Sequence, residues 1–152
     1  MATALRTEII IKETPLKIWE VLTDFAAYPE WNPFIRSLEG RPVTGSKLGV
    51  LLVPPGGKGM KFRPQVLKAD AGKEFRWLGR LFLPGIFDGE HYFQLHDNGD
   101  GTTTFVQGEN FRGLLVPFMK SMLEGGTKNG FTAMNETLKN RCEQVTADIS
   151  RL

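Results

Sequence analysis

The chain has 152 residues, of which 41% are hydrophobic and 24% are charged, so it is long enough for one domain with its own core and too short for two ordinary domains. Its formal net charge is +2 at pH 7, and Lys and Arg alternate with Asp and Glu, which excludes the basic stripe of a nucleic-acid-binding surface. We therefore expect a single folded domain over residues 1–152 that binds no nucleic acid.

A strand is predicted over Leu5–Lys12, because its Ile and Thr residues favour an extended chain with one buried face. Thr14 and Pro15 then predict the start of a helix, since the threonine oxygen can cap it and proline needs no N–H there. The apolar residues of this short helix repeat at helical spacing: Ile18, Trp19, Leu22 and Phe25. We expect the helix to end before Pro29 and Tyr28–Pro33 to be a proline-restricted loop.

The pattern then changes to short β-type runs that are separated by Gly and Pro clusters. The close spacing of these runs favours antiparallel hairpins over parallel crossovers. Six strands are predicted: Phe34–Glu39, Leu48–Val53, Met60–Ala69, Phe75–Phe82, Phe87–His96 and Thr102–Phe111.

The clearest turn is Asp97–Gly101, where Asn and Gly tolerate positive φ between two alternating runs. If Leu95 lies opposite Thr103, the two strands place both aromatic and polar side chains on one face. The expected cross-strand pairs are Phe93 with Phe105, His91 with Gln107, and Gly89 with Glu109.

Helical periodicity returns in the last part of the chain and predicts a long amphipathic helix from Phe131 to Ile149. Leu114–Leu123 predicts an earlier turn or two of helix, and the glycines that follow are expected to weaken or kink the connection. These glycines are Gly125, Gly126 and Gly130. The apolar stripe of the long helix comprises Phe131, Met134, Leu138, Cys142, Val145 and Ile149.

Several classes of protein are excluded by what the sequence lacks. Residues 1–12 do not read as a secretory signal, and no apolar run is long enough for a transmembrane segment. The single cysteine, Cys142, excludes an internal disulfide and a cysteine-based metal cluster. We therefore expect a cytoplasmic protein with no metal and no other cofactor.

Five segments together resemble the START-like (SRPBCC) superfamily, and within it the polyketide cyclase/dehydrase and lipid-transport group. They are Pro15–Phe25, Tyr28–Phe34, Gly89–Phe93, Gly101–Thr102 and Glu109–Leu115. The resemblance extends from about Arg6 to Glu143 and implies the helix-grip fold of the α+β class. In that fold a seven-stranded, curved antiparallel sheet wraps around the long C-terminal helix and leaves a hydrophobic cavity between them. No single reaction is implied, because the superfamily contains carriers, sensors and cyclases.

A cavity of this kind predicts a set of ligand-binding residues on the inner faces. The aromatic side chains can be cavity wall or core packing, and the polar ones can orient a ligand or bond one another. His91 and Glu109 are the only candidates for a catalytic base, and no nucleophile or metal-ligand signature accompanies them. The predicted ligand-binding set is Trp31, Phe75, Trp77, His91, Phe93, Phe105, Gln107, Glu109, Phe118, Met122, Phe131 and Met134.

The predicted function is noncovalent binding of a hydrophobic small molecule that is lipid-like, polyketide-like or aromatic. One alternative is a cyclase, aromatase or dehydratase that uses the same cavity, with His91 or Glu109 moving a proton. Another is an accessory protein that regulates or delivers to an unidentified protein partner.

Overall fold

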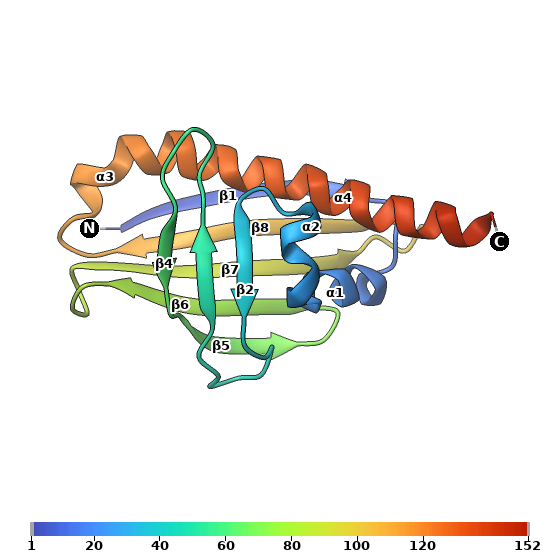
Figure 1. The fold of residues 1–152 in the computed structure, drawn as a ribbon, viewed down its shortest axis with the longest axis horizontal. Helices are drawn as coiled ribbons and strands as arrows, with labels where there is room; N and C mark the ends of the chain where they lie inside the picture. Colours follow the sequence, from blue (N-terminus) through green and yellow to red (C-terminus); the bar gives the residue numbers. More distant parts are fainter. Residues whose placement is uncertain (1, 152) are drawn as a thin grey trace.

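The structure, a computed structural model, describes residues 2–151; the side chains of residue 2 and of residues 145–150 lie outside that description. Its described strands form two antiparallel sheets, a larger one in the order β1-β8-β7-β6-β5 and a smaller one in the order β2-β3-β4 (Figure 1). The strands are β1 Ala2–Ile11, β2 Ile35–Glu39, β3 Gly49–Leu52, β4 Met60–Phe62, β5 Gln65–Asp70, β6 Glu74–Leu81, β7 Phe87–Asp97 and β8 Thr103–Arg112.

The sequence prediction of seven strands in one sheet is not confirmed, because the described residues form eight strands in two sheets. The predicted run Met60–Ala69 is divided: β4 pairs with β3, whereas β5 pairs with β6. Pro64 lies at the division, and it has no N–H to continue a ladder. Its carbonyl instead accepts a hydrogen bond of 2.9 Å from the backbone N–H of Leu48. The chain therefore changes sheets at this proline.

The helical segments are α1 Pro15–Thr23, the 3₁₀ turn η1 Phe25–Ala27, α2 Tyr28–Trp31, α3 Val116–Met122, the π-helical turn η2 Leu123–Thr127 and α4 Lys128–Ser150. The predicted start of α1 is confirmed, since Oγ1 of Thr14 accepts a hydrogen bond from the N–H of Lys17 at 3.4 Å. The expected loop at Tyr28–Pro33 is wrong over its first four residues, which form α2. Pro29 lies in the first turn of α2, where a missing N–H leaves no hydrogen bond unmade.

The C-terminal helices follow the sequence prediction closely. The earlier helical turns are α3, and the expected weak connection is the π-helical turn that contains Gly125 and Gly126. On α4, the apolar stripe is buried at Phe131, Met134, Leu138 and Cys142. The predicted stripe residues Val145 and Ile149 lie outside the described side chains.

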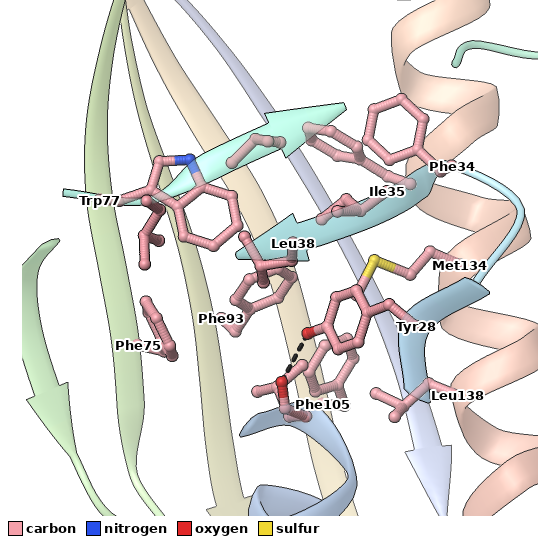
Figure 2. Packing of buried hydrophobic residues seen from close by; sticks show 14 of the residues in the cluster. Tyr28, Phe34, Ile35, Leu38, Phe75, Trp77, Phe93, Phe105, Met134 and Leu138 are labelled. Atoms are coloured by element: carbon pink, nitrogen blue, oxygen red, sulfur yellow. Dashed lines mark hydrogen bonds between the residues drawn. The ribbon is translucent and has the colours of Figure 1, made fainter. Parts of the chain in front are cut away.

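The hydrophobic core lies between the inner face of the larger sheet and a second layer that includes β2, α2 and α4. Figure 2 shows Trp77, Phe93 and Phe105 of the larger sheet facing β2 and the Met134 and Leu138 side chains of α4. All five side chains are at most 1% exposed and belong to one buried cluster. Each contributes on the order of 2–3 kcal/mol of transfer free energy.

The β7–β8 hairpin has the predicted inner face but a different register. His91 lies opposite Glu109, and Gly89 lies opposite Phe111, so the predicted pairs are displaced by two residues. Phe93 likewise faces Gln107, and Leu95 faces Phe105.

The displacement arises because β7 continues to Asp97, which pairs with Thr103. The loop between them is closed by a hydrogen bond of 3.1 Å from the N–H of Asn98 to the carbonyl of Thr102. A displacement of two residues preserves the alternation of side chains. The predicted polar residues therefore remain on the inner face.

Candidate functional site

A small apolar pocket lies between the larger sheet, the β3–β4 hairpin and the helical segments α3 and η2. Its volume is about 50 Å³, enough for a few water molecules and below the roughly 300 Å³ of a typical small-molecule site. Most of its lining is apolar: Leu52, Met60, Phe62, Leu81, Phe87, Phe111, Met119, Met122 and Leu123.

Two glycines form the floor of this pocket. Gly79 of β6 and Gly89 of β7 lie directly opposite each other in the larger sheet, and both line the pocket. A Cβ on Gly89 would come within 2.9 Å of Oε1 of Glu109, and a Cβ on Gly79 within 3.2 Å of the Phe62 ring. The absence of a side chain at both positions therefore lets Glu109 and Phe62 approach the sheet closely at the pocket.

Glu109 supplies the one carboxylate among the described lining residues. Its side chain is 10% exposed, and its Oε1 lies 3.6 Å from Nδ1 of His91. A carboxylate at an apolar wall strongly favours a hydrogen-bond donor or a positive charge nearby, because its desolvation is otherwise costly. Glu109 therefore gives the pocket a polar anchor, in addition to its other polar lining residues, Arg80 and Thr127.

The hydrogen bonds of Gln107 fix the protonation of one His91 nitrogen. Nε2 of Gln107 donates to Oδ1 of Asn135 at 2.7 Å and to the carbonyl of Phe131 at 3.3 Å. Its Oε1 then faces Nε2 of His91 at 3.1 Å, so the histidine nitrogen must donate.

With Nε2 of His91 protonated, Nδ1 of the neutral ring carries a lone pair. Two acceptors, this nitrogen and Oε1 of Glu109, would then face each other across 3.6 Å. His91 and Glu109 therefore place two hydrogen-bond acceptors side by side at the pocket.

A polar chain continues from this pair to the C-terminal helix. Nδ2 of Asn135 donates to Oγ1 of Thr7 at 2.8 Å, and that hydroxyl donates to the carbonyl of Gln107 at 2.9 Å. His91, Gln107 and Asn135 are at most 3% exposed. The chain thereby satisfies buried polar groups and fixes the His91 ring, which Trp77 also holds by stacking at 4.9 Å between centroids.

The structure separates the predicted ligand-binding set into three groups. Glu109 and Met122 line the pocket. Phe118 does not: it is 84% exposed on α3, and the prediction that it faces a cavity is corrected. Its place in α3 turns it toward solvent, whereas Met119 of the same helix lines the pocket.

The remaining predicted residues pack in or against the core. Trp31 is partly buried, and its indole N–H has no hydrogen-bond partner in the described structure. The others are buried: Phe75, Trp77, His91, Phe93, Phe105, Gln107, Phe131 and Met134. They fill the space that the sequence prediction assigned to a cavity.

Sequence reasoning missed most of the pocket lining, together with the contribution of Asn135. The glycines at positions 79 and 89 are the signal that was available, because glycine inside a strand often marks an open or closely approached surface. Position 135 lies next to Met134 of the apolar stripe, where a buried amide implies a polar partner. In the described residues no cluster of His, Cys, Asp or Glu is arranged to hold a metal ion.

Comparison with protein families gives one match, which covers nearly the whole chain. The family model for polyketide cyclase / dehydrase and lipid transport matches residues 2–143. No curated protein matches the chain. The family resemblance predicted from the sequence segments is therefore confirmed.

Solved structures share the fold at low sequence identity. A START superfamily protein from Mycobacterium smegmatis is 22% identical with a TM-score of 0.70, over 93% of this chain and 98% of that chain. Norcoclaurine synthase from Thalictrum flavum, in complex with dopamine and hydroxybenzaldehyde, is 14% identical with a TM-score of 0.72, over 95% and 88%.

A third similar structure is the di-domain ARO/CYC protein StfQ from the steffimycin biosynthetic pathway. It is 9% identical with a TM-score of 0.78, over 97% of this chain and 53% of that chain. At such identities the likeness shows the fold alone: an α+β, START-like arrangement with a long C-terminal helix.

Proposed function

Because the chain belongs to the polyketide cyclase / dehydrase and lipid transport family, we propose that it binds a hydrophobic small molecule in the pocket at Glu109. The observation that supports this proposal is an apolar pocket with one carboxylate among its described lining residues. Apolar walls provide binding free energy of about 25 cal/mol for each Å² that the ligand removes from water, while the few polar lining residues select its orientation.

The ligand enters by displacing side chains at the rim. Three methionines line the pocket: Met60, Met119 and Met122. Their unbranched thioether chains change rotamer readily and adapt to irregular apolar shapes. A pocket of about 50 Å³ therefore expands when a ligand takes the place of these side chains.

Glu109 favours a ligand whose buried end carries a hydroxyl or an amino group. Its Oε1 accepts from such a donor, and a cationic amine gains the attraction of the opposite charge as well. His91 lies behind Glu109 and outside the lining. In this proposal His91, Trp77 and Phe93 form a rigid layer that holds Glu109 in place.

Titration with the neutral fluorescent probe N-phenyl-1-naphthylamine tests this site. The decisive variant is Met122→Trp, because Met122 lines the pocket and is 40% exposed, so a larger ring blocks the entrance without disturbing the core. Leu67→Trp is the matched control, since Leu67 is also 40% exposed but lies on β5.

We expect the parent and Leu67→Trp to bind the probe with the same affinity and Met122→Trp to bind about tenfold more weakly, a difference of about 1.4 kcal/mol. A parent protein that takes up no probe would refute the proposal. Equal affinity of both tryptophan variants would place the ligand elsewhere.

A cyclase-type or dehydratase-type enzyme is the second candidate, and the His91–Glu109 pair favours it. The pair places an imidazole nitrogen and a carboxylate oxygen 3.6 Å apart at the edge of the pocket, and general acid–base catalysis on a bound substrate uses groups of these types. Replacing Glu109 by Gln would abolish turnover in such an enzyme while the protein still binds the neutral probe. In a carrier the same change alters only affinity and selectivity, and in an accessory protein that acts through a partner it changes neither.

A further inference from the structure

One end of the molecule carries large apolar side chains that point into solvent. They lie in the β6–β7 loop and in the region of α3, at the left-hand end of Figure 1. Phe82 and Leu83 are 77% and 74% exposed, and Leu114 and Phe118 are 72% and 84% exposed. We call these four residues the apolar tip. Side chains of this size are rarely exposed together on a monomer without a binding role.

The two segments of the apolar tip are tied to each other. The backbone N–H of Leu114 donates to the carbonyl of Gly85 at 3.1 Å, and the N–H of Leu115 donates to the carbonyl of Ile86 at 3.0 Å. The tip is therefore one surface with a fixed backbone, in which Phe82 holds a positive φ of 68°. Such a conformation is unfavourable for a bulky residue, and packing does not explain it because the ring is exposed.

Basic residues outnumber acidic ones in the segments that carry the apolar tip and the pocket lining. The segments 53–64, 80–90 and 112–128, which border the tip and the pocket, carry seven Lys or Arg residues and three Asp or Glu residues. The whole chain carries 19 Lys or Arg residues and 17 Asp or Glu residues, so acidic residues outnumber basic ones outside these three segments. Arg80 and Arg112 are both cross-strand neighbours of Asp88, whose carboxylate lies 3.6 Å from Arg80. Lys120, two residues from Phe118, lies 3.8 Å from Glu124 in an exposed ion pair.

We propose that the apolar tip docks on the surface of a lipid bilayer that contains anionic lipids. The four apolar side chains enter the interface between head groups and acyl chains, as amphipathic membrane-binding surfaces do. The surrounding cations contact the negatively charged head groups. Apolar side chains at loop ends, in segments with a net positive charge, fit a deformable anionic surface.

Docking in this way brings the pocket to the membrane. Met122 follows Phe118 by one helical turn on α3 and lines the pocket, and Leu81 precedes Phe82 and also lines it. A lipid-like molecule that leaves the bilayer beside the tip therefore meets the pocket rim. The docking surface itself consists of other residues, so it stands independently of the function proposed for the pocket.

Cosedimentation with vesicles tests the proposal, using phosphatidylcholine alone and phosphatidylcholine mixed with phosphatidylserine. The decisive variant is Leu83→Asp with Phe118→Asp, since both side chains are largely exposed and contribute nothing to the core. Leu16→Asp is the control, because Leu16 is 62% exposed on α1, at the other end of Figure 1.

We expect the parent and Leu16→Asp to bind the phosphatidylserine vesicles in a salt-sensitive manner and the double variant to bind more than about tenfold more weakly. The double variant should still take up N-phenyl-1-naphthylamine, which separates this proposal from that for the pocket. Absence of parent binding to anionic vesicles would overturn the inference. So would a parent dimer in sedimentation velocity that the double variant abolishes, because a second copy would then cover the tip.

Discussion

Gly130 of α4 lies directly against the ring of Phe34, and a methyl group at position 130 would overlap the ring carbons. The ring is 1% exposed and stands edge-on to Phe131 with 5.6 Å between centroids. Protein cores are close-packed, so the buried ring has no free volume into which it can move. The long helix therefore approaches the start of β2 only because residue 130 lacks a side chain.

The first prediction follows from this contact. Gly130→Ala gains about 1 kcal/mol of helix propensity, but overlap with a buried ring puts the overpacking cost in the upper part of its range, about 2–3 kcal/mol, so we expect a net loss of stability of about 1–2 kcal/mol. Gly125→Ala is the control, since a Cβ there meets nothing within 4 Å, and it should be neutral or slightly stabilising. Urea unfolding of the three proteins measures both effects, and equal midpoints would contradict the contact.

The second prediction concerns Glu74 of β6. Burial alone would raise its pKa, but hydrogen bonds from Gln94 and Arg76 and the charges of Arg76 and Lys68 hold the pKa below its usual value. A lowered pKa in the folded state stabilises the fold above the unfolded pKa, and this contribution disappears as the pH falls through the folded pKa.

Glu74→Gln should therefore lower stability by about 1–3 kcal/mol at pH 7, with a difference from the parent that shrinks as the solution is acidified below the ordinary glutamate value of 4.5. Urea unfolding at several pH values measures this. The exposed position Glu136 on α4 provides the control Glu136→Gln, for which we expect no such change. If the stability difference between the parent and Glu74→Gln grows toward acidic pH, the pKa of Glu74 is not lowered in the folded protein.

The third prediction is that Cys142 is inert in the folded protein. Burial, with Glu13 and Glu143 nearby, raises the pKa of its thiol to about 12, and the residue is 2% exposed. Because the thiolate is the reactive form, Ellman's reagent should fail to label the native protein at pH 8 and should label it fully in denaturing urea. Rapid stoichiometric labelling without urea would contradict the burial of this thiol.

The fourth prediction tests the ligand selectivity that we propose for Glu109. In Glu109→Gln the volume is preserved and the new amide donates to Nδ1 of His91, so the protein should fold and bind N-phenyl-1-naphthylamine as the parent does. Displacement of the probe by dodecylamine should weaken about tenfold, since a charge-assisted hydrogen bond is lost, and displacement by dodecanoate should improve.

The control for this experiment is Glu90→Gln. Glu90 precedes His91 on β7 and pairs with Arg76 at 3.5 Å, on the opposite face of the sheet. Its displacement profile should match that of the parent. Identical profiles for Glu109→Gln and the parent would leave Glu109 a structural residue.

Local signals in the sequence were sufficient to predict most helices and strands and to predict which residues lie on the inner face of the β7–β8 hairpin. The side chain alternation keeps His91, Gln107 and Glu109 inside whether the register is displaced by two residues or not. The register itself depends on hydrogen bonds within the loop from Asn98 to Thr102, which the residue types alone do not specify. The change of sheet at Pro64 was readable in principle, because proline interrupts a ladder.

The pocket is harder to predict than the fold because it is the volume that packing leaves empty. Aromatic residues such as Trp77 and Phe93 satisfy the pattern of a cavity wall and of a filled core equally well, and here they interdigitate at 5.5 Å between ring centroids. Which inner-face position stays open depends on the sizes of all its neighbours, above all on the Gly79–Gly89 pair. The exposure of Phe118 was equally hard to predict, because the direction of its side chain depends on how α3 packs against the rest of the protein.

The order of strands in the larger sheet has a consequence for synthesis of the chain. β1 pairs with β8, and the bond from Thr7 to the carbonyl of Gln107 joins residues that are 100 positions apart. At a translation rate of about 5–20 residues per second, the first strand waits on the order of 5–20 s before its partner exists. During that interval its edge is an unpaired template for aggregation. The nascent chain must therefore stay protected at its beginning until β8 emerges and takes its place between β1 and β7.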